Sequence, residues 1–261
     1  MRINDVLQSR FGTGWVKEAR MNKNTDPLQS AEKSIGNSGT VSVAIDGPSG
    51  VGKTSIARSI AEKRHYLYID TGAMFRALAV YYVKKGIPAE DEEQVILHLP
   101  EISLDMKHKE GTQHMIVNGT DVTDELRTEM ISHAASVISQ YGAVRTRLLE
   151  MQRMIAETEN VVMDGRDIGT VVLPKATLKA FLTARPHVRA ERRYRQLAAL
   201  GKLDGATLES IEKDIAERDY RDSHREIAPL KPADDAVIID TSDLTIGEVE
   251  AKILGALEER I

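Results

Sequence analysis

Residues Val41-Ser-Val-Ala-Ile-Asp46 run directly into Gly47-Pro-Ser-Gly-Val-Gly-Lys53-Thr54-Ser55, and a helical pattern follows through Lys63. The short β-branched run predicts a buried strand, and G-x-x-x-x-G-K-[ST] between a strand and a helix is the pattern of a phosphate-binding loop. Glycine lets the backbone wrap closely around a phosphate, and the amides at the start of the helix then face the anion. We therefore predict that the phosphates of a nucleotide bind here.

All residues of this loop are predicted ATP contacts: Gly47, Pro48, Ser49, Gly50, Val51, Gly52, Lys53, Thr54 and Ser55. Lys53 is expected to reach the β- and γ-phosphates of the nucleotide. A hydroxyl that follows the lysine holds Mg²⁺ in such loops, and both Thr54 and Ser55 qualify. Asp164 ends another predicted strand and is the third predicted magnesium ligand.

The composition narrows the class of protein. The chain has 261 residues, and 35 Lys and Arg against 40 Asp and Glu give a net charge of −5, which argues against a nucleic-acid coat. The absence of cysteine excludes a disulfide framework, an iron–sulfur cluster, a thiolate zinc site and a cysteine nucleophile. The longest apolar runs, such as Val41–Ile45, are far shorter than the roughly 18 residues that cross a bilayer. We expect a cytoplasmic monomer that binds neither nucleic acid nor membranes.

The residue composition and the pattern of apolar residues change near residue 41. Scattered Gly, Ser and Asn in residues 1–40 predict a flexible N-terminal extension; a transit peptide, or a true start at Met21 or later, are the alternatives. Residues 41–261 alternate β-branched runs with helical periods, which predicts one α/β domain around a central parallel five-stranded sheet flanked by helices. The predicted strands are Val41–Asp46, Tyr66–Asp70, Val161–Asp164, Leu178–Leu182 and Ala236–Asp240.

The sequence also predicts one antiparallel segment and the starts or ends of three helices. Alternating apolar residues and the dipeptide Asn118-Gly119 predict a small antiparallel insert at residues 101–122. A helix is expected between Pro186 and Gly201, and another around Leu208 that ends near Arg221. Thr245 with Glu248 predicts a capping box at the start of the last helix.

A phosphate loop indicates a nucleotide but not a reaction. The chain has no N-K-x-D string after the loop, which argues against a guanine-nucleotide switch, and it lacks the length and motifs of an ABC-type or helicase motor. Among the classes of protein with a phosphate-binding loop, this leaves the small-molecule kinases. A phosphate acceptor, with a second pKa of roughly 6, is already mostly dianionic at neutral pH, so it needs fixed cations more than a base. Arginine suits this task because it binds phosphate bidentately.

Four segments concentrate arginine. Two follow predicted strands, Asp70-Thr-Gly-Ala-Met-Phe-Arg76 and Asp164-Gly-Arg166-Asp167. The others are Arg185–Arg195, with five arginines, and Arg218–Arg225, where Arg218, Asp222 and Arg225 would share one helical face if the helix continues that far. Together these segments are expected to surround a second phosphate.

Each segment also has a simpler interpretation. Arg218 with Asp222 fits a solvated ion pair worth about a few tenths of a kcal/mol. Arg185–Arg195 fits a nucleic-acid patch, although no aromatic platform for base stacking accompanies it. Arg145 fits the polar face of its helix, and Asp164 fits a turn at a strand end. Their occurrence together with the phosphate loop favours the phosphate-acceptor interpretation.

Four strings, in this order and spacing, resemble the bacterial cytidylate kinases: Gly47–Lys53, Asp70–Arg76, Asp164-Gly-Arg-Asp-Ile-Gly-Thr170, and Glu217–Arg225 followed by Ala228-Pro-Leu. The resemblance covers about residues 41–261. It implies a P-loop kinase fold in which residues 101–122 enlarge an NMP-binding region and residues 185–204 form a helical lid. It also implies transfer of a phosphoryl group from ATP to CMP, and to dCMP, with Mg²⁺ as cofactor.

The resemblance further implies roles for individual residues. The contacts to cytosine would be Thr71, Ser136, Arg145 and Asp167. The acceptor phosphate would lie against Arg76, Arg166 and Arg225, with Arg218 and Asp222 near the sugar. The groups assigned to catalysis are Lys53, Asp164, Arg166 and the lid residues Arg189, Arg192 and Arg193.

The assignment of cytosine agrees with its chemistry. Cytosine presents an N4 amino donor that the carboxylate of Asp167 accepts, whereas uracil presents an O4 acceptor at the same place. The alternatives are a kinase for another acceptor, such as AMP, UMP or shikimate, an ATP-dependent nucleic-acid-binding protein that uses Arg185–Arg195, and a catalytically inactive regulatory homologue.

Overall fold

The computed structural model describes residues 39–109 and 112–261. Almost all of the predicted N-terminal extension, residues 1–38, therefore lies outside the described residues. The described chain divides into two compact units. The first, here called the P-loop unit, comprises residues 39–71 and 152–261, and the second unit comprises residues 72–151.

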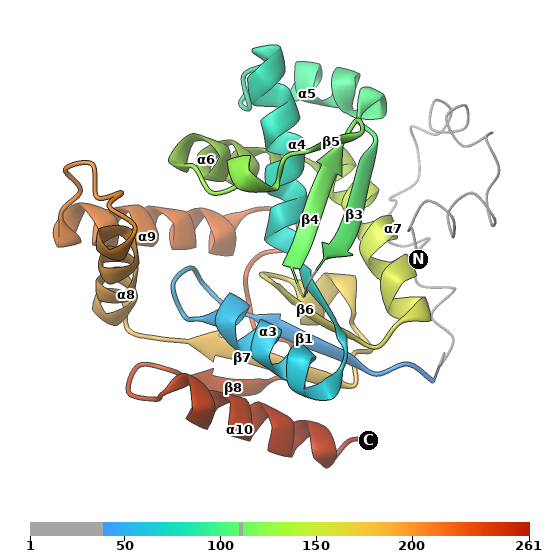
Figure 1. Ribbon diagram of the computed structural model, residues 1–261, viewed down its shortest axis with the longest axis vertical. Helices are drawn as coiled ribbons and strands as arrows, with labels where there is room; N and C mark the ends of the chain where they lie inside the picture. Colours follow the sequence, from blue (N-terminus) through green and yellow to red (C-terminus); the bar gives the residue numbers. More distant parts are fainter. Residues whose placement is uncertain (1–38, 110–111) are drawn as a thin grey trace. The chain divides into compact units, whose positions relative to one another are not determined.

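The P-loop unit is built on a sheet of five parallel strands in the order β2-β6-β1-β7-β8 (Figure 1). The strands are β1 (Ser42–Asp46), β2 (Leu67–Asp70), β6 (Val161–Gly165), β7 (Leu178–Thr183) and β8 (Val237–Asp240). All five predicted strands are confirmed, with bounds that shift by one residue at most. Their apolar runs fit strands that are covered on both faces, as parallel strands normally are.

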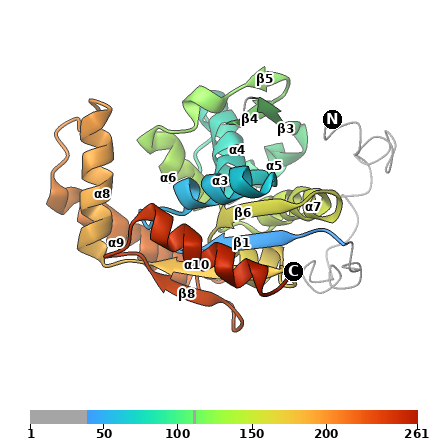
Figure 2. The same cartoon turned by 60° about the horizontal axis from the view of Figure 1, so that its bottom comes forward.

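Helices α3 (Lys53–Arg64) and α10 (Ile246–Glu258) cover one face of this sheet (Figure 2). The core between them is aliphatic, as the low aromatic content requires, and includes Val43, Ile56, Ile253 and Leu257. The predicted capping box opens α10: Thr245 accepts a hydrogen bond from the amide of Glu248, whose carboxylate accepts one from the amide of Thr245.

Two further helices form a hairpin with a small core of its own. Helix α8 (Pro186–Ala199) begins at the expected proline, and α9 (Leu208–His224) extends three residues beyond its predicted end. Ala190, Ile211 and Ile215 form the buried cluster between them. None of the helices in the described part of the chain is long and apolar enough to cross a bilayer.

The second unit combines helices with an antiparallel sheet. The helices are α4 (Thr71–Lys85, of which residues 72–85 belong here), α5 (Glu92–His98), η4 (Leu99–Glu101), η5 (Thr123–Glu125), α6 (Glu129–Ile138) and the part of α7 (Gly142–Thr158) that ends at Met151. The sheet has the strands β3 (Leu104–Lys109), β4 (Thr112–Val117) and β5 (Thr120–Asp121), which confirms the predicted antiparallel insert. Asn118 and Gly119 both have positive φ, as the tight turn between β4 and β5 requires.

The topology of the P-loop unit indicates where ligands bind. From β1 the chain passes through α3 to β2 at one edge, whereas from β6 it passes through η6 (Ile168–Val172) to β7 on the other side of β1. Ligands of open parallel sheets bind beyond the carboxyl ends of the strands at such a reversal of direction. Both the glycine loop after β1 and the arginine-containing turn after β6 lie at this edge.

Candidate active site

The loop after β1 has the backbone conformation of a phosphate cradle. Gly47, Gly50 and Gly52 all have positive φ, where a side chain would be strained. A Cβ at Gly47 would also lie 2.1 Å from the carbonyl oxygen of Leu182, and a Cβ at Gly50 would lie 3.0 Å from the Cβ of Arg189. Glycine is therefore required at 47 and 50 both by the backbone conformation and by the neighbours.

Lys53 is the first residue of α3, and its ammonium group folds back over the loop. Its Nζ donates hydrogen bonds to the carbonyl oxygens of Gly47 and Pro48, both at 2.7 Å. Burial lowers the pKa of Lys53, the charge of Arg166 lowers it further, and Asp164 opposes both effects. A buried cation that is short of negative charge is well suited to receive a polyphosphate.

The predicted magnesium ligands lie together, and the structure distinguishes the two hydroxyls. Thr54 Oγ1 donates to Asp164 Oδ2 at 3.1 Å, whereas the side chain of Ser55 is exposed and has no such contact. Tyr68 donates to the other oxygen of Asp164 at 2.8 Å. Burial raises the pKa of Asp164, and Asp70 raises it further. A carboxylate with a hydroxyl beside it is the oxygen donor set that Mg²⁺ uses when phosphates and water complete its coordination.

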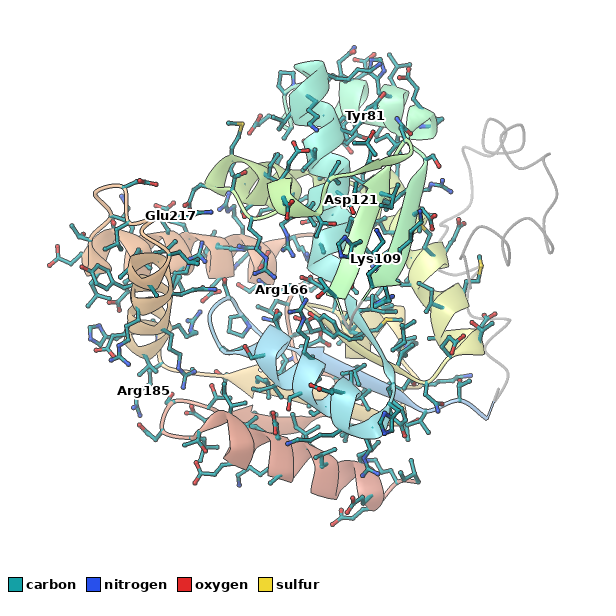
Figure 3. The ribbon with its side chains drawn as sticks, viewed as in Figure 1. Tyr81, Lys109, Asp121, Arg166, Arg185 and Glu217 are labelled. Carbon is teal, nitrogen blue, oxygen red and sulfur yellow. The ribbon has the colours of Figure 1, made fainter. Side chains whose placement is uncertain are left out.

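The turn after β6 carries two charged pairs. Arg166 Nε donates to Asp222 Oδ2 at 2.8 Å, and Arg225 Nη2 donates to Asp167 Oδ1 at 3.2 Å (Figure 3 labels Arg166). Burial opposes the charge of Asp222, but Arg166 and then Arg218 hold its pKa below the ordinary value. The structure thus brings together the predicted residues of the turn, Asp222 of α9, and Arg225, which directly follows α9 in an extended conformation and does not share its helical face.

Asp46, which the sequence analysis did not single out, holds this turn in place. It is the last residue of β1 and is 4% exposed. Its two carboxylate oxygens accept hydrogen bonds from the amides of Ile168 and Gly169, at 2.8 and 2.7 Å. These amides directly follow Asp167, so Asp46 links the phosphate loop to the turn that carries the predicted base contact.

Burial of Asp46 disfavours its charged form in the folded protein, which makes stability depend on pH. Burial raises its pKa to about 7 from the ordinary 3.8. Its contribution to stability is therefore complete below pH 3.8 and is lost as the pH rises from there through about 7. We expect Asp46→Asn to abolish this loss, so that the variant gains stability relative to the wild type between pH 5 and pH 8.

Urea denaturation at both pH values measures this difference. Asp243→Asn is the control, because Arg185 lowers the pKa of Asp243, so this carboxyl group ionises below the tested range. The pH profile of the control should run parallel to that of the wild type. Parallel profiles for wild type and Asp46→Asn would contradict the assignment.

The three predicted lid arginines lie on α8 and have different contacts. Arg189 is 4% exposed and donates through Nη1 to the carbonyl oxygen of Ser49 at 3.1 Å and to Asp219 at 2.5 Å. Arg192 donates to the backbone and hydroxyl oxygens of Thr241. Arg193 donates to Gln196 on its own helix, at 3.1 Å.

Carboxylates neutralise part of the basic stretch that starts at Arg185. Arg185, at the start of α8 (Figure 3), makes a bidentate pair with Asp243, and Arg195 pairs with Glu191. Arg189 pairs with Asp219. Since carboxylates neutralise three of its five guanidinium groups, the stretch is less basic than its sequence indicates, and this does not favour a nucleic-acid surface.

The remaining predicted contacts divide between the two units. Thr71 belongs to the P-loop unit, where its hydroxyl donates to the carbonyl oxygen of Asp164 at 2.8 Å. Arg76, Ser136 and Arg145 belong to the second unit.

Within the second unit, α6 and α7 bring two predicted base contacts close together. Arg145 Nη1 donates to the carbonyl oxygen of Ser139 at 3.1 Å, and Ser139 Oγ donates to that of Ser136 at 2.9 Å. The guanidinium of Arg145 lies over the ring of Phe75, which immediately precedes Arg76 on α4. The hydroxyl of Ser136 is buried and has no hydrogen-bond partner among the described residues. Such a hydroxyl is suited to a bound ligand.

Comparison with known proteins identifies the family to which this chain belongs. The family model described as "Cytidylate kinase" matches residues 43–259. A cytidylate kinase from Halalkalibacterium halodurans is 44% identical over 221 residues, which are 85% of this chain and 99% of that protein. The chain belongs to the cytidylate kinase family. Cytidylate kinases from Ligilactobacillus salivarius and Leuconostoc mesenteroides are 46% and 42% identical, over 84% of this chain and 96% and 97% of theirs.

Membership of the cytidylate kinase family applies to nearly all of the described chain. The matched residues include the glycine loop, the turn after β6 and the charged face of α9. They also include both units, so the antiparallel sheet and the α8–α9 hairpin belong to the family domain and are not separate additions.

Proposed function

We propose that this kinase transfers the γ-phosphoryl group of MgATP to CMP, and to dCMP, and releases ADP. The observation that carries the proposal is the arrangement of the P-loop unit. A phosphate cradle and two guanidinium–carboxylate pairs follow neighbouring strands, β1 and β6, at the same edge of the sheet. A donor polyphosphate and an acceptor phosphate are both polyanions, so they need fixed cations to approach each other.

The donor binds to the glycine loop. The amides of residues 50–55 surround its phosphates, and Lys53 turns from the carbonyl oxygens of Gly47 and Pro48 toward the β- and γ-phosphates. Thr54 and Asp164 would hold Mg²⁺, which supplies neutralisation of the phosphate charge. Their contact and the exposure of Ser55 support Thr54 as the hydroxyl ligand.

The acceptor phosphate binds to Arg166 and Arg225 of the P-loop unit. Arg166 and Arg225 each have a carboxylate partner and are held in fixed orientations before the phosphate arrives. Arg76 supplies a further cation from the second unit. Because the acceptor oxygen is already anionic, no residue has to deprotonate it, and transfer depends on positioning and on charge stabilisation.

Cytosine is selected by Asp167 together with Thr71, Ser136 and Arg145. The carboxylate of Asp167 can accept from the N4 amino group, and Arg225 holds it in a buried position. A 2′-hydroxyl adds one polar partner near Arg218 and Asp222, so its loss in dCMP should be tolerated.

An assay of ADP formation with MgATP and each of CMP, dCMP, UMP and AMP tests this proposal. CMP and dCMP should be good acceptors, and kcat/KM for UMP should be lower by about 100-fold or more, because O4 of uracil would face the carboxylate of Asp167 where cytosine offers an amino donor. Preference for AMP or UMP would replace the proposal with a different nucleotide specificity. No activity with any of the four would support the inactive homologue.

A further inference from the structure

The phosphate loop directs its amides toward the nucleotide, so its carbonyl oxygens point elsewhere and need other partners. Lys53 occupies those of Gly47 and Pro48, and the amide of Ile56 occupies that of Gly52. Two more, those of Ser49 and Val51, accept hydrogen bonds from outside the loop and its helix. These two contacts are made by residues that motif analysis did not connect to the loop.

The contact to Val51 comes from Thr241, in the connection between β8 and α10. Its Oγ1 donates to the carbonyl oxygen of Val51 at 3.2 Å, and its amide donates to the carbonyl oxygen of Thr183 at the end of β7. The side chain is 2% exposed, so water does not replace these partners. Thr241 is thereby fixed against the sheet and against the loop.

Arg192 of α8 binds the same threonine twice. Nη1 donates to Thr241 Oγ1 at 3.0 Å, and Nη2 donates to Thr241 O at 2.6 Å. The hydroxyl therefore accepts from the guanidinium while it donates to Val51, and such linked hydrogen bonds strengthen each other. This chain of contacts connects the α8–α9 hairpin to the centre of the phosphate loop.

We propose that Thr241 and Arg192 form a brace that sets the conformation of the phosphate loop for the donor nucleotide. In this arrangement Arg192 is a positioning residue, and Thr241 is a further determinant of ATP affinity. The inference builds on the proposed kinase activity, because it concerns the loop that binds its donor.

A double-mutant cycle on ATP affinity tests the brace. We measure the Kd for MgATP by calorimetry for Thr241→Val, Arg192→Met and the double variant. Valine keeps the shape of threonine but cannot donate or accept. Each single change should weaken MgATP binding by about tenfold, the size of a hydrogen bond that involves a charged group. The double variant should be little weaker than either single one, because both changes break the same chain of contacts.

Three further variants separate the brace from simpler explanations. Thr241→Ser keeps the hydroxyl, so its affinity for MgATP should stay within about twofold of the wild type. Arg192→Lys keeps the charge but loses the bidentate contact to Thr241, so its affinity for MgATP should remain weakened. The control cycle pairs Thr241→Val with Arg195→Met, since Arg195 contacts Glu191 on the same helix. The two effects in that cycle should multiply. The Kd for CMP should change less than about twofold throughout.

Two outcomes would overturn the proposal. One is an Arg192→Met variant that loses kcat with an unchanged Kd for MgATP while Thr241→Val behaves like the wild type, since Arg192 would then act on the transferred group directly. The other is a Thr241/Arg192 cycle whose effects multiply. Failure of the wild type to phosphorylate CMP would contradict the proposed function alone, because MgATP binding remains measurable in every variant.

Discussion

Lys53→Ala is expected to lower kcat by at least about 100- to 1,000-fold, the usual effect of removing one preorganised group that stabilises developing charge. The buried ammonium has a lowered pKa because it lies in a desolvated site beside Arg166, so the arriving phosphates supply the negative charge that it lacks. CMP should still bind with an affinity close to that of the wild type, because no acceptor contact has been assigned to this residue. Single-turnover kinetics and equilibrium binding of CMP measure the two effects separately.

Lys63→Ala is the matched control. Lys63 lies on the same helix, is half exposed and pairs with Glu250. Its removal should leave kcat within about twofold of the wild type, because its partner Glu250 belongs to α10 and not to the glycine loop. Equal activity of Lys53→Ala and Lys63→Ala would show that the glycine loop does not serve as the donor site.

Asp167→Asn is expected to lower the preference for CMP over UMP by about 100-fold, measured as the ratio of kcat/KM values. The amide can offer a donor to O4 of uracil, so the variant loses the rejection of UMP as well as the attraction of CMP. The effect should fall mainly on KM, because the base contact is made both before and during the transfer.

The matched control here is Asp235→Asn. Asp235 pairs with Lys179 in the same unit and is exposed, so its substitution should leave the CMP to UMP ratio unchanged. An unaltered ratio in Asp167→Asn would remove this residue as the reader of the base. Loss of activity toward both nucleotides with an unchanged ratio would instead assign Asp167 to the support of Arg225.

The elements whose structure depends on residues adjacent in the sequence could be predicted from the sequence. The strand, glycine loop and helix at residues 41–64 form one continuous local pattern, and so does the capping box at Thr245. The five parallel strands were recognisable because buried strands of this type are short runs of β-branched residues bounded by turns. The antiparallel insert was recognisable from its alternation and from Asn118-Gly119.

The partners of the charged residues could not be predicted in the same way. Asp46 binds amides more than 120 positions away, and Thr241 binds a carbonyl oxygen 190 positions away. No periodicity connects such residues, since the contact exists only after the strands have taken their order in the sheet. One signal was present: several of the predicted strands end in aspartate, and Asp46, Asp70 and Asp164 all lie at the ligand edge of the sheet.

The partners of the arginines could not be predicted from the sequence either. Their concentration in four segments predicted a site for an anion, but not which guanidinium would face which carboxylate. Asp219, which pairs with Arg189, and Phe75, which lies under Arg145, were both missed although each is adjacent to a predicted residue in the sequence. The side chains that orient a functional group depend on the packing of helices, which local motifs do not encode.

The central claim is that the phosphoryl group passes directly from ATP to the phosphate of CMP. ³¹P NMR of the wild-type protein with MgATP and CMP tests it most directly, because it distinguishes every phosphorus-containing product. CDP and ADP should accumulate in equal amounts, and ATP should persist when CMP is omitted. Consumption of ATP to ADP and inorganic phosphate, with CMP left unchanged, would contradict it.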